Sequence, residues 1–246
     1  MDKIFTVRYG KQAATRPLMV TGSSWITIGA VLLTAAIHAM AQGGEVQQAV
    51  QQAVAENKQK LQHYQWIETT QLTLNGEAKP PTQNMCRYGP DGQVQKMPVG
   101  PAPVPPSGGR LKQRVIEKKK AEIKDYMGDV KGVIALYVPP DPQKMKQAIQ
   151  SGKVSLNPAG GMVNIVFPDY AQPGDRMTIT FDSAAKKVVA LDVNTYMGET
   201  KDVVTLQVQM ASLPDGTNYT QQTILNATAK KIVATTTNSS YQKLGN

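Results

Sequence analysis

The sequence is short of the residues on which most enzyme chemistry depends. Its 246 residues include one cysteine and two histidines, and aromatic residues make up only 6%. One cysteine excludes an internal disulfide framework and any metal site with several cysteine ligands. The Gly-x-Ser-x-Gly, His-Glu-x-x-His, P-loop and Gly-x-Gly-x-x-Gly patterns are also missing from the sequence. We therefore predict no cofactor and no metal site. The low aromatic content argues against a stacking platform for carbohydrate or single-stranded nucleic acid.

A few residues keep an enzymatic alternative open. His63 and Cys86 allow a cysteine–histidine dyad on paper, although a histidine at a helix end is more often a surface or capping residue. Glu68 falls on the apolar side of a predicted strand, and Asp125 lies on a predicted helix. A carboxylate-dependent hydrolase built on such groups is the weaker alternative, because a glutamate at a sheet rim is usually structural.

The N-terminal segment has the pattern of a signal peptide. Residues 1–24 hold four basic residues and one acidic residue, and an almost wholly apolar run extends from Trp25 to Ala39. Ala39-Met40-Ala41 then places small residues two positions apart, which predicts cleavage after Ala41 and a periplasmic or secreted mature protein. An uncleaved membrane anchor is the alternative, but the run of about 15 residues is short of the roughly 20 that a span requires.

The remaining chain, residues 42–246, is predicted to form a single α+β domain. The segment 1–41 contains four of the 27 basic and one of the 18 acidic residues, so the remainder carries a net charge of +6. Helical spacing is found over residues 44–63, 110–137 and 142–151, the last after an Asp141-Pro142 start. Residues 98–109 hold five prolines and three glycines and are predicted to form an extended surface loop.

Period-two alternation dominates the rest of the chain. Strands are predicted within residues 64–74, 82–88, 93–97, 162–167, 177–181, 189–193, 204–210, 219–225 and 232–237. Asn75-Gly76 is a strong hairpin signal, because both turn positions favour a positive φ. Alternation with one polar side indicates an antiparallel sheet that is covered on one face and wet on the other. We predict a curved antiparallel sheet of about nine strands, an incomplete barrel with helices on its concave face.

Basic residues crowd the predicted helix at 110–137. Its basic face includes Arg114, Lys118, Lys119 and Lys120. This face is suited to lipid phosphates of an anionic membrane surface or to an acidic partner, although most such runs are simply solvated. Nucleic acid is not a predicted partner, because basic residues are not interleaved with aromatic ones.

Four segments resemble a family of uncharacterised exported bacterial proteins. They are Tyr64-Gln-Trp-Ile-Glu-Thr-Thr, Arg87-Tyr-Gly-Pro-Asp-Gly, Lys118-Lys-Lys-Ala-Glu-Ile-Lys-Asp-Tyr-Met and Tyr137-Val-Pro-Pro-Asp-Pro. Separately, the order of elements is similar to that of the LolA/LppX-like superfamily of periplasmic lipoprotein and lipid carriers. This architectural resemblance implies an apolar cavity between sheet and helices, and it carries over no binding residue.

The resulting hypothesis is a non-enzymatic cell-envelope protein that binds an apolar or lipidic ligand between sheet and helices, with a lipid or a lipoprotein as its partner. Its predicted lining residues are Trp66, Leu72, Leu74, Ile123, Met127 and Ile134. Methionine suits a pocket that must adapt to its ligand. The alternative is a structural or protein-interaction module whose sheet–helix space is a filled core.

Overall fold

The structure is a computed structural model that describes residues 56–100, 110–185 and 187–245. Its elements are β1 (Tyr64–Leu74), β2 (Glu77–Ala78), β3 (Thr82–Tyr88), β4 (Val94–Val99), α3 (Arg110–Ile134), α4 (Pro142–Gln150), β5 (Ser155–Ala159), β6 (Met162–Pro168), β7 (Arg176–Asp182), β8 (Lys187–Met197), β9 (Glu199–Ser212), β10 (Asn218–Ala227), the 3-10 turn η1 (Thr228–Lys230) and β11 (Ile232–Lys243). Residues 56–62 are also helical. The predicted signal peptide, most of the predicted helix at 44–63 and most of the loop at 98–109 lie outside the described residues.

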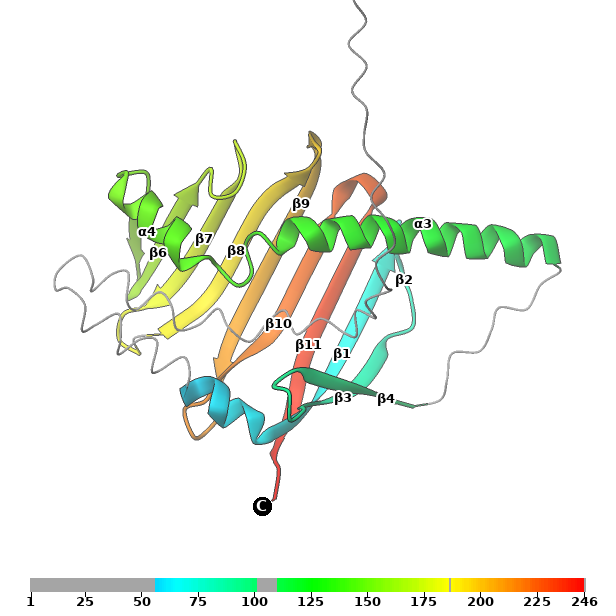
Figure 1. Ribbon diagram of the computed structural model, residues 1–246, viewed down its shortest axis with the longest axis horizontal. Helices are drawn as coiled ribbons and strands as arrows, with labels where there is room; N and C mark the ends of the chain where they lie inside the picture. The colour runs from blue at the N-terminus through cyan, green and yellow to red at the C-terminus, as the bar shows by residue number, and fades with distance from the viewer. Residues whose placement is uncertain (1–55, 101–109, 186, 246) are drawn as a thin grey trace, which may run out of the picture.

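The strands form one open, antiparallel sheet, which confirms the predicted type of sheet (Figure 1). The order is β4-β3-β1-β11-β10-β9-β8-β7-β6-β5, and β2 pairs with β1 off this path. All neighbours along the chain from β5 to β11 pair as a meander, whereas β1 pairs with β11 from Tyr64↔Lys243 to Leu74↔Ile232. This long-range pairing joins the four strands that precede α3 to the seven that follow it.

The sheet has eleven strands instead of the expected nine or so, because two strands lack an apolar alternation. β2 is only two residues long, and both residues are exposed. β5 has the sequence SLNPA and is exposed throughout, so burial leaves no period-two signal in it. The strands at the two edges, β4 and β5, contain Pro98 and Pro158, and an edge is where a strand tolerates proline.

Local turn and capping signals are confirmed. Asn75 and Gly76 have φ values of 53° and 83°, as the hairpin between β1 and β2 requires. The Asp141 side chain accepts hydrogen bonds from the backbone N–H groups of Gln143 at 2.8 Å and Lys144 at 3.4 Å, so it caps α4. α3 ends at Ile134, three residues before the predicted end at 137, because the chain turns there toward Val138 and two prolines.

Both α3 and α4 pack against the same face of the sheet. Tyr126, Val130 and Ile134 of α3 and Met145 of α4 are buried in one cluster with inward-facing strand residues such as Phe167. The first half of α3 differs, because residues 117–122 are all exposed and the helix extends past β1 (Figure 1). No helix in the described part of the chain is long and apolar enough to cross a membrane.

A buried carboxylate holds the turn between β6 and β7. Asp175 is 3% exposed, and its oxygens accept hydrogen bonds from the backbone N–H groups of Tyr170 at 2.6 Å, Ala171 at 3.0 Å and Gln172 at 2.7 Å. The hydroxyl of Tyr137 donates a further hydrogen bond to the same carboxylate. Burial raises the pKa of Tyr137, and the hydrogen bond to Asp175 raises it further. Asp175 therefore ties the turn to the segment that joins α3 and α4.

Candidate functional site

The helix-bearing face of the sheet carries two separate apolar clusters. The first apolar cluster is the one that includes Phe167 and the buried residues of α3 and α4. The second apolar cluster consists of Leu61, Trp66, Cys86 and Tyr88, with Val94, Tyr219 and Tyr241 packed against it. Within it the ring of Trp66 stacks on that of Tyr241, with centroids 5.5 Å apart and an angle of 11° between the planes.

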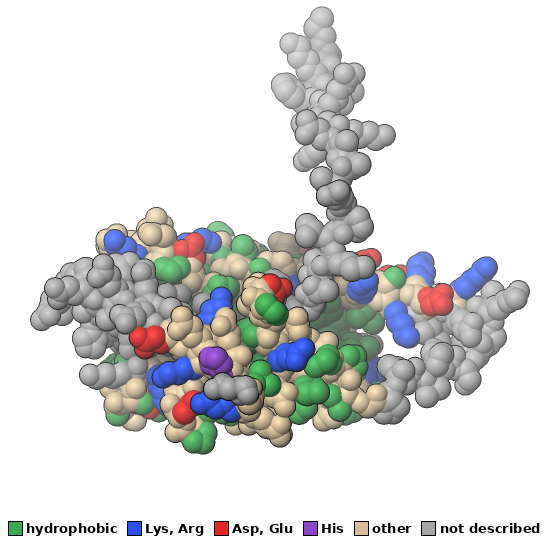
Figure 2. All heavy atoms as spheres, turned by 60° about the horizontal axis from the view of Figure 1, so that its bottom comes forward, with side chains coloured by type: hydrophobic (Ala, Val, Ile, Leu, Met, Phe, Trp, Pro, Cys, Tyr) green, Lys and Arg blue, Asp and Glu red, His purple; other side chains and the backbone are tan. Residues whose placement is uncertain are grey.

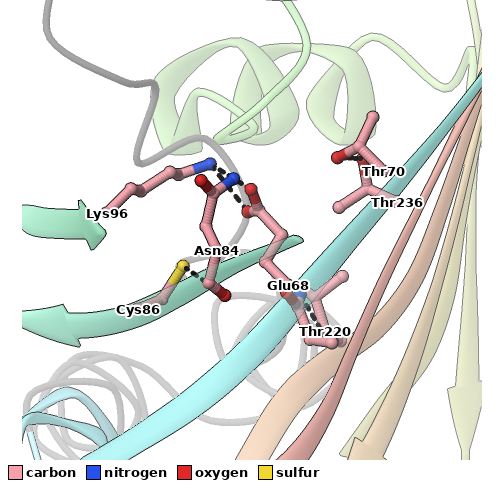
Figure 3. A network of polar contacts seen from close by, with 8 residues as sticks. Glu68, Thr70, Asn84, Cys86, Lys96, Thr220 and Thr236 are labelled. Atoms are coloured by element: carbon pink, nitrogen blue, oxygen red, sulfur yellow. Dashed lines mark hydrogen bonds and ion pairs between the residues drawn. The ribbon is translucent and has the colours of Figure 1, made fainter. Parts of the chain in front are cut away.

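Polar side chains on the same face lie between the two clusters. We call this group the polar seam; it consists of Glu68, Thr70, Asn84, Lys96, Thr223, Thr236 and Asn238. The strand register explains it: Glu68 of β1 lies opposite both Asn84 of β3 and Asn238 of β11, and Thr70 lies opposite Thr236, whose other neighbour is Thr223. Because cross-strand partners share a face, Asn84, Glu68 and Asn238 form one row across the strands, and Thr70, Thr236 and Thr223 form the next. Figure 3 shows Glu68 beside Asn84 and Lys96, with Thr70 and Thr236 further along.

One ion pair lies within the polar seam. The ammonium Nζ of Lys96 contacts both carboxylate oxygens of Glu68, at 2.6 and 2.7 Å. The side chains of Lys96 and Glu68 are 23% and 12% exposed, so water reaches the pair only partly. In the second row the hydroxyls of Thr70 and Thr236 share a hydrogen bond of 3.2 Å. The structure thus places Glu68 in an ion pair rather than alone among apolar groups.

Two buried oxygens of the polar seam accept no hydrogen bond in the described part of the chain. Asn238 donates from Nδ2 to the backbone carbonyl of Thr220 at 2.9 Å, but its Oδ1 has no partner. The Oγ1 of Thr223 likewise has no hydrogen-bond partner among the described residues, and Thr223 and Asn238 are each 8% exposed. Because most buried polar atoms are paired, these two oxygens have capacity that a water molecule or a polar group of a ligand would satisfy.

The predicted lining residues fall into two groups. Leu72, Leu74, Ile123 and Met127 are half-buried and pack against the first apolar cluster, to which the buried Ile134 belongs. All five therefore border or belong to the same apolar cluster, two from β1 and three from α3. Trp66 does not join them, because it lies in the second apolar cluster on the other side of the polar seam.

The predicted basic face lies on the first half of α3. Arg114, Lys118, Lys119 and Lys120 are all exposed. Figure 2 shows Lys and Arg side chains along this projecting end, with acidic side chains between them. Within residues 114–124 the acidic residues are Glu117 and Glu122, so the described part of this helix end is basic overall.

The residues considered for catalysis are not assembled into a site. Asp125 is exposed on α3, while Glu68 is held by Lys96. Cys86 is fully buried, its Sγ lies 3.9 Å from the backbone carbonyl of Asn84, and no hydrogen bond links it to His63 among the described residues. Those residues also contain no group of three or more His, Cys, Asp or Glu side chains that could hold a metal ion.

The buried thiol leads to a first prediction. Burial raises the pKa of Cys86 to about 11, with a smaller contribution from the Glu68 carboxylate. At pH 8 its thiolate fraction is then about a hundredfold lower than that of a thiol with an ordinary pKa. We expect the native protein to resist an aromatic disulfide reagent, and the unfolded protein to react with it stoichiometrically. Rapid labelling in the native state would contradict the buried position, and Cys86→Ser provides the blank.

A shallow pocket of about 410 Å³ lies around the turn between β3 and β4, next to Tyr88 of the second apolar cluster. Its lining residues are Gln62, Arg87, Tyr88, Gly89, Pro90, Gln95 and Leu244. Only Tyr88 connects it to that cluster, and none of its lining residues belongs to the polar seam.

Comparison with known proteins gives one structural similarity and no match in sequence. No protein-family model matches it, and no curated protein matches its sequence. Among solved structures, the fold is similar to the crystal structure of a DUF1329 family protein from Desulfovibrio piger, with 9% sequence identity and a TM-score of 0.39. The similarity covers 76% of this chain and 88% of the other. A similarity at this level assigns neither a site nor a function.

Proposed function

We propose that the protein is exported and binds an apolar or lipidic ligand on the helix-bearing face of its sheet, without catalysing a reaction. In this proposal residues 1–41 are removed as a signal peptide. The sheet curves into an incomplete barrel with the helices on its concave face. The apolar part of the ligand lies between α3 and β1, and its polar part lies at the polar seam.

One observation carries the proposal. Leu72 of β1 and Ile123 and Met127 of α3 are only half-buried, and the polar seam with its two unpaired oxygens begins one row further along the sheet. An interior that served stability alone would fill apolar positions completely and pair its polar atoms. Half-buried apolar side chains next to polar oxygens without hydrogen-bond partners suit an amphiphilic ligand, which has an apolar and a polar part. The alternative, a module with a filled core, has support in the fully buried residues of the first apolar cluster.

Extraction of lipid from the purified protein tests the proposal. We expect native mass spectrometry to detect a lipid-sized adduct, and Met127→Trp to lower its occupancy at least tenfold by filling the space beside β1. Val115→Trp is the matched control, since Val115 lies on the same helix and is 56% exposed. A wild-type protein that neither carries lipid nor takes it up from micelles would favour the filled-core module.

The projecting half of α3 supports a second part of the proposal, contact with an anionic membrane surface. Each lysine near such a surface contributes about 1 kcal/mol at moderate ionic strength. We expect Lys118→Gln combined with Lys119→Gln to weaken binding to vesicles of one-third phosphatidylglycerol by about 10- to 30-fold in a sedimentation assay. Lys58→Gln with Lys146→Gln removes the same charge from exposed positions elsewhere and should leave binding nearly unchanged. Equal loss in both variants would contradict a role for α3.

A further inference from the structure

The polar seam has no net charge to offer a ligand. Its one cation, Lys96, contacts both oxygens of its one carboxylate, Glu68. Glu68 already neutralises Lys96 and takes two of its three N–H donors, so an anionic headgroup would gain the full charge of Lys96 only by displacing Glu68, which would then lie 12% exposed without its partner. Such an exchange leaves a carboxylate largely out of water and is strongly unfavourable.

The two unpaired oxygens of the polar seam restrict which chemical groups of a ligand can bind there. The Oδ1 of Asn238 is a carbonyl oxygen and can only accept, and the hydrogen bond from Nδ2 to the Thr220 carbonyl fixes the orientation of the amide. The Oγ1 of Thr223 can accept and donate. Phosphate and carboxylate oxygens of a lipid are acceptors and cannot satisfy Asn238. A hydroxyl group both donates and accepts, so it satisfies either residue.

We propose, on the basis of the function proposed above, that the ligand is an uncharged lipid with a hydroxyl-bearing polar end, such as an acylglycerol. The hydroxyl donates to Asn238 Oδ1 and exchanges a hydrogen bond with Thr223 Oγ1, and the acyl chains run toward Leu72 and Met127. Both oxygens are covered by neighbouring side chains, so these side chains move aside as the ligand enters. Because Lys96 and Glu68 stay paired, neither offers an unpaired countercharge to a charged headgroup.

Three lipids with the same acyl chain and different polar ends test this selectivity. Equal amounts of dioleoylglycerol, oleic acid and dioleoyl phosphatidic acid are offered in neutral detergent micelles to the full chain, and the bound lipid is identified by native mass spectrometry. We expect dioleoylglycerol to exceed each anionic lipid at least tenfold. Preference for oleic acid or phosphatidic acid would overturn this inference while leaving lipid binding intact. Binding of none of the three would overturn the proposed function and this inference together.

Two kinds of variant locate the selectivity in the polar seam. Thr223→Val keeps the shape and removes the hydroxyl, and we expect it to lower dioleoylglycerol binding about tenfold. Glu68→Gln releases Lys96, and we expect it to reverse the preference toward phosphatidic acid by tenfold or more. Glu77→Gln, at the exposed pair with Lys79, is the matched control and should leave the preference unchanged. An unaltered preference in both seam variants, with unchanged melting curves, would show that selection occurs elsewhere.

Discussion

Replacing Asp175 by asparagine is expected to lower the free energy of unfolding by about 3–5 kcal/mol. The carboxylate accepts from three backbone N–H groups and from the Tyr137 hydroxyl, and it is 3% exposed. Asparagine keeps one acceptor oxygen but turns an amide N–H₂, itself a donor, toward N–H groups that need an acceptor. The hydrogen bonds from Tyr170 and Tyr137 are buried and those from Ala171 and Gln172 are part-buried, so each lost hydrogen bond carries much of its desolvation cost.

Chemical denaturation followed by circular dichroism measures this effect. Asp182→Asn is the matched control, because among the described residues Asp182 accepts through Oδ1, from Ala184 and Ala185 at 2.9 Å each, in an exposed turn. Asparagine retains that oxygen, so the control should lose less than about 1 kcal/mol. A loss of the same size in both variants would mean that Asp175 acts as an ordinary turn residue.

Breaking the ion pair of the polar seam from one side is the second prediction. Lys96→Met should cost about 2–3 kcal/mol, because it leaves the Glu68 carboxylate 12% exposed and without its partner. Adding Glu68→Gln should recover most of the loss, since the double variant contains no unpaired charge. Unfolding of both single variants and the double variant completes a double-mutant cycle.

The exposed pair of Lys79 and Glu77 is the reference for this cycle. Its atoms lie 2.8 Å apart, but the side chains are 37% and 75% exposed, so Lys79→Met should cost no more than about 0.5 kcal/mol. Strictly additive losses at Lys96 and Glu68 would show that solvent screens the seam pair as well.

Local signals in the sequence predicted most of the elements. Asn75-Gly76 and the Asp141 cap act through their own backbone neighbours, and the alternation in β9 reports burial of Val204, Leu206 and Val208 on one face. The pairing of β1 with β11 joins residues about 170 positions apart, and no local pattern encodes it. β5 was not predicted, because its residues are all exposed and, with Pro158 among them, resemble those of a loop.

The candidate site was predicted only in part. The apolar residues of β1 and α3 were found because their spacing marks the buried side of each element, but Trp66 shares its strand face with Glu68 and Thr70 and lies beyond them. The inward position of Glu68 was visible in the alternation, whereas its partner Lys96 depends on the pairing of three strands. Thr223, Thr236 and Asn238 resemble ordinary strand residues until the register places them side by side.

The two prolines at the margins of the sheet have a consequence for behaviour at high concentration. An open sheet ends in two rows of free backbone groups, along which another molecule could add strand upon strand until a fibre forms. Pro98 in β4 and Pro158 in β5 each lack the N–H that such growth requires, one at either margin. Each edge of the open sheet thus contains a residue that interrupts the backbone pairing on which association between copies would depend.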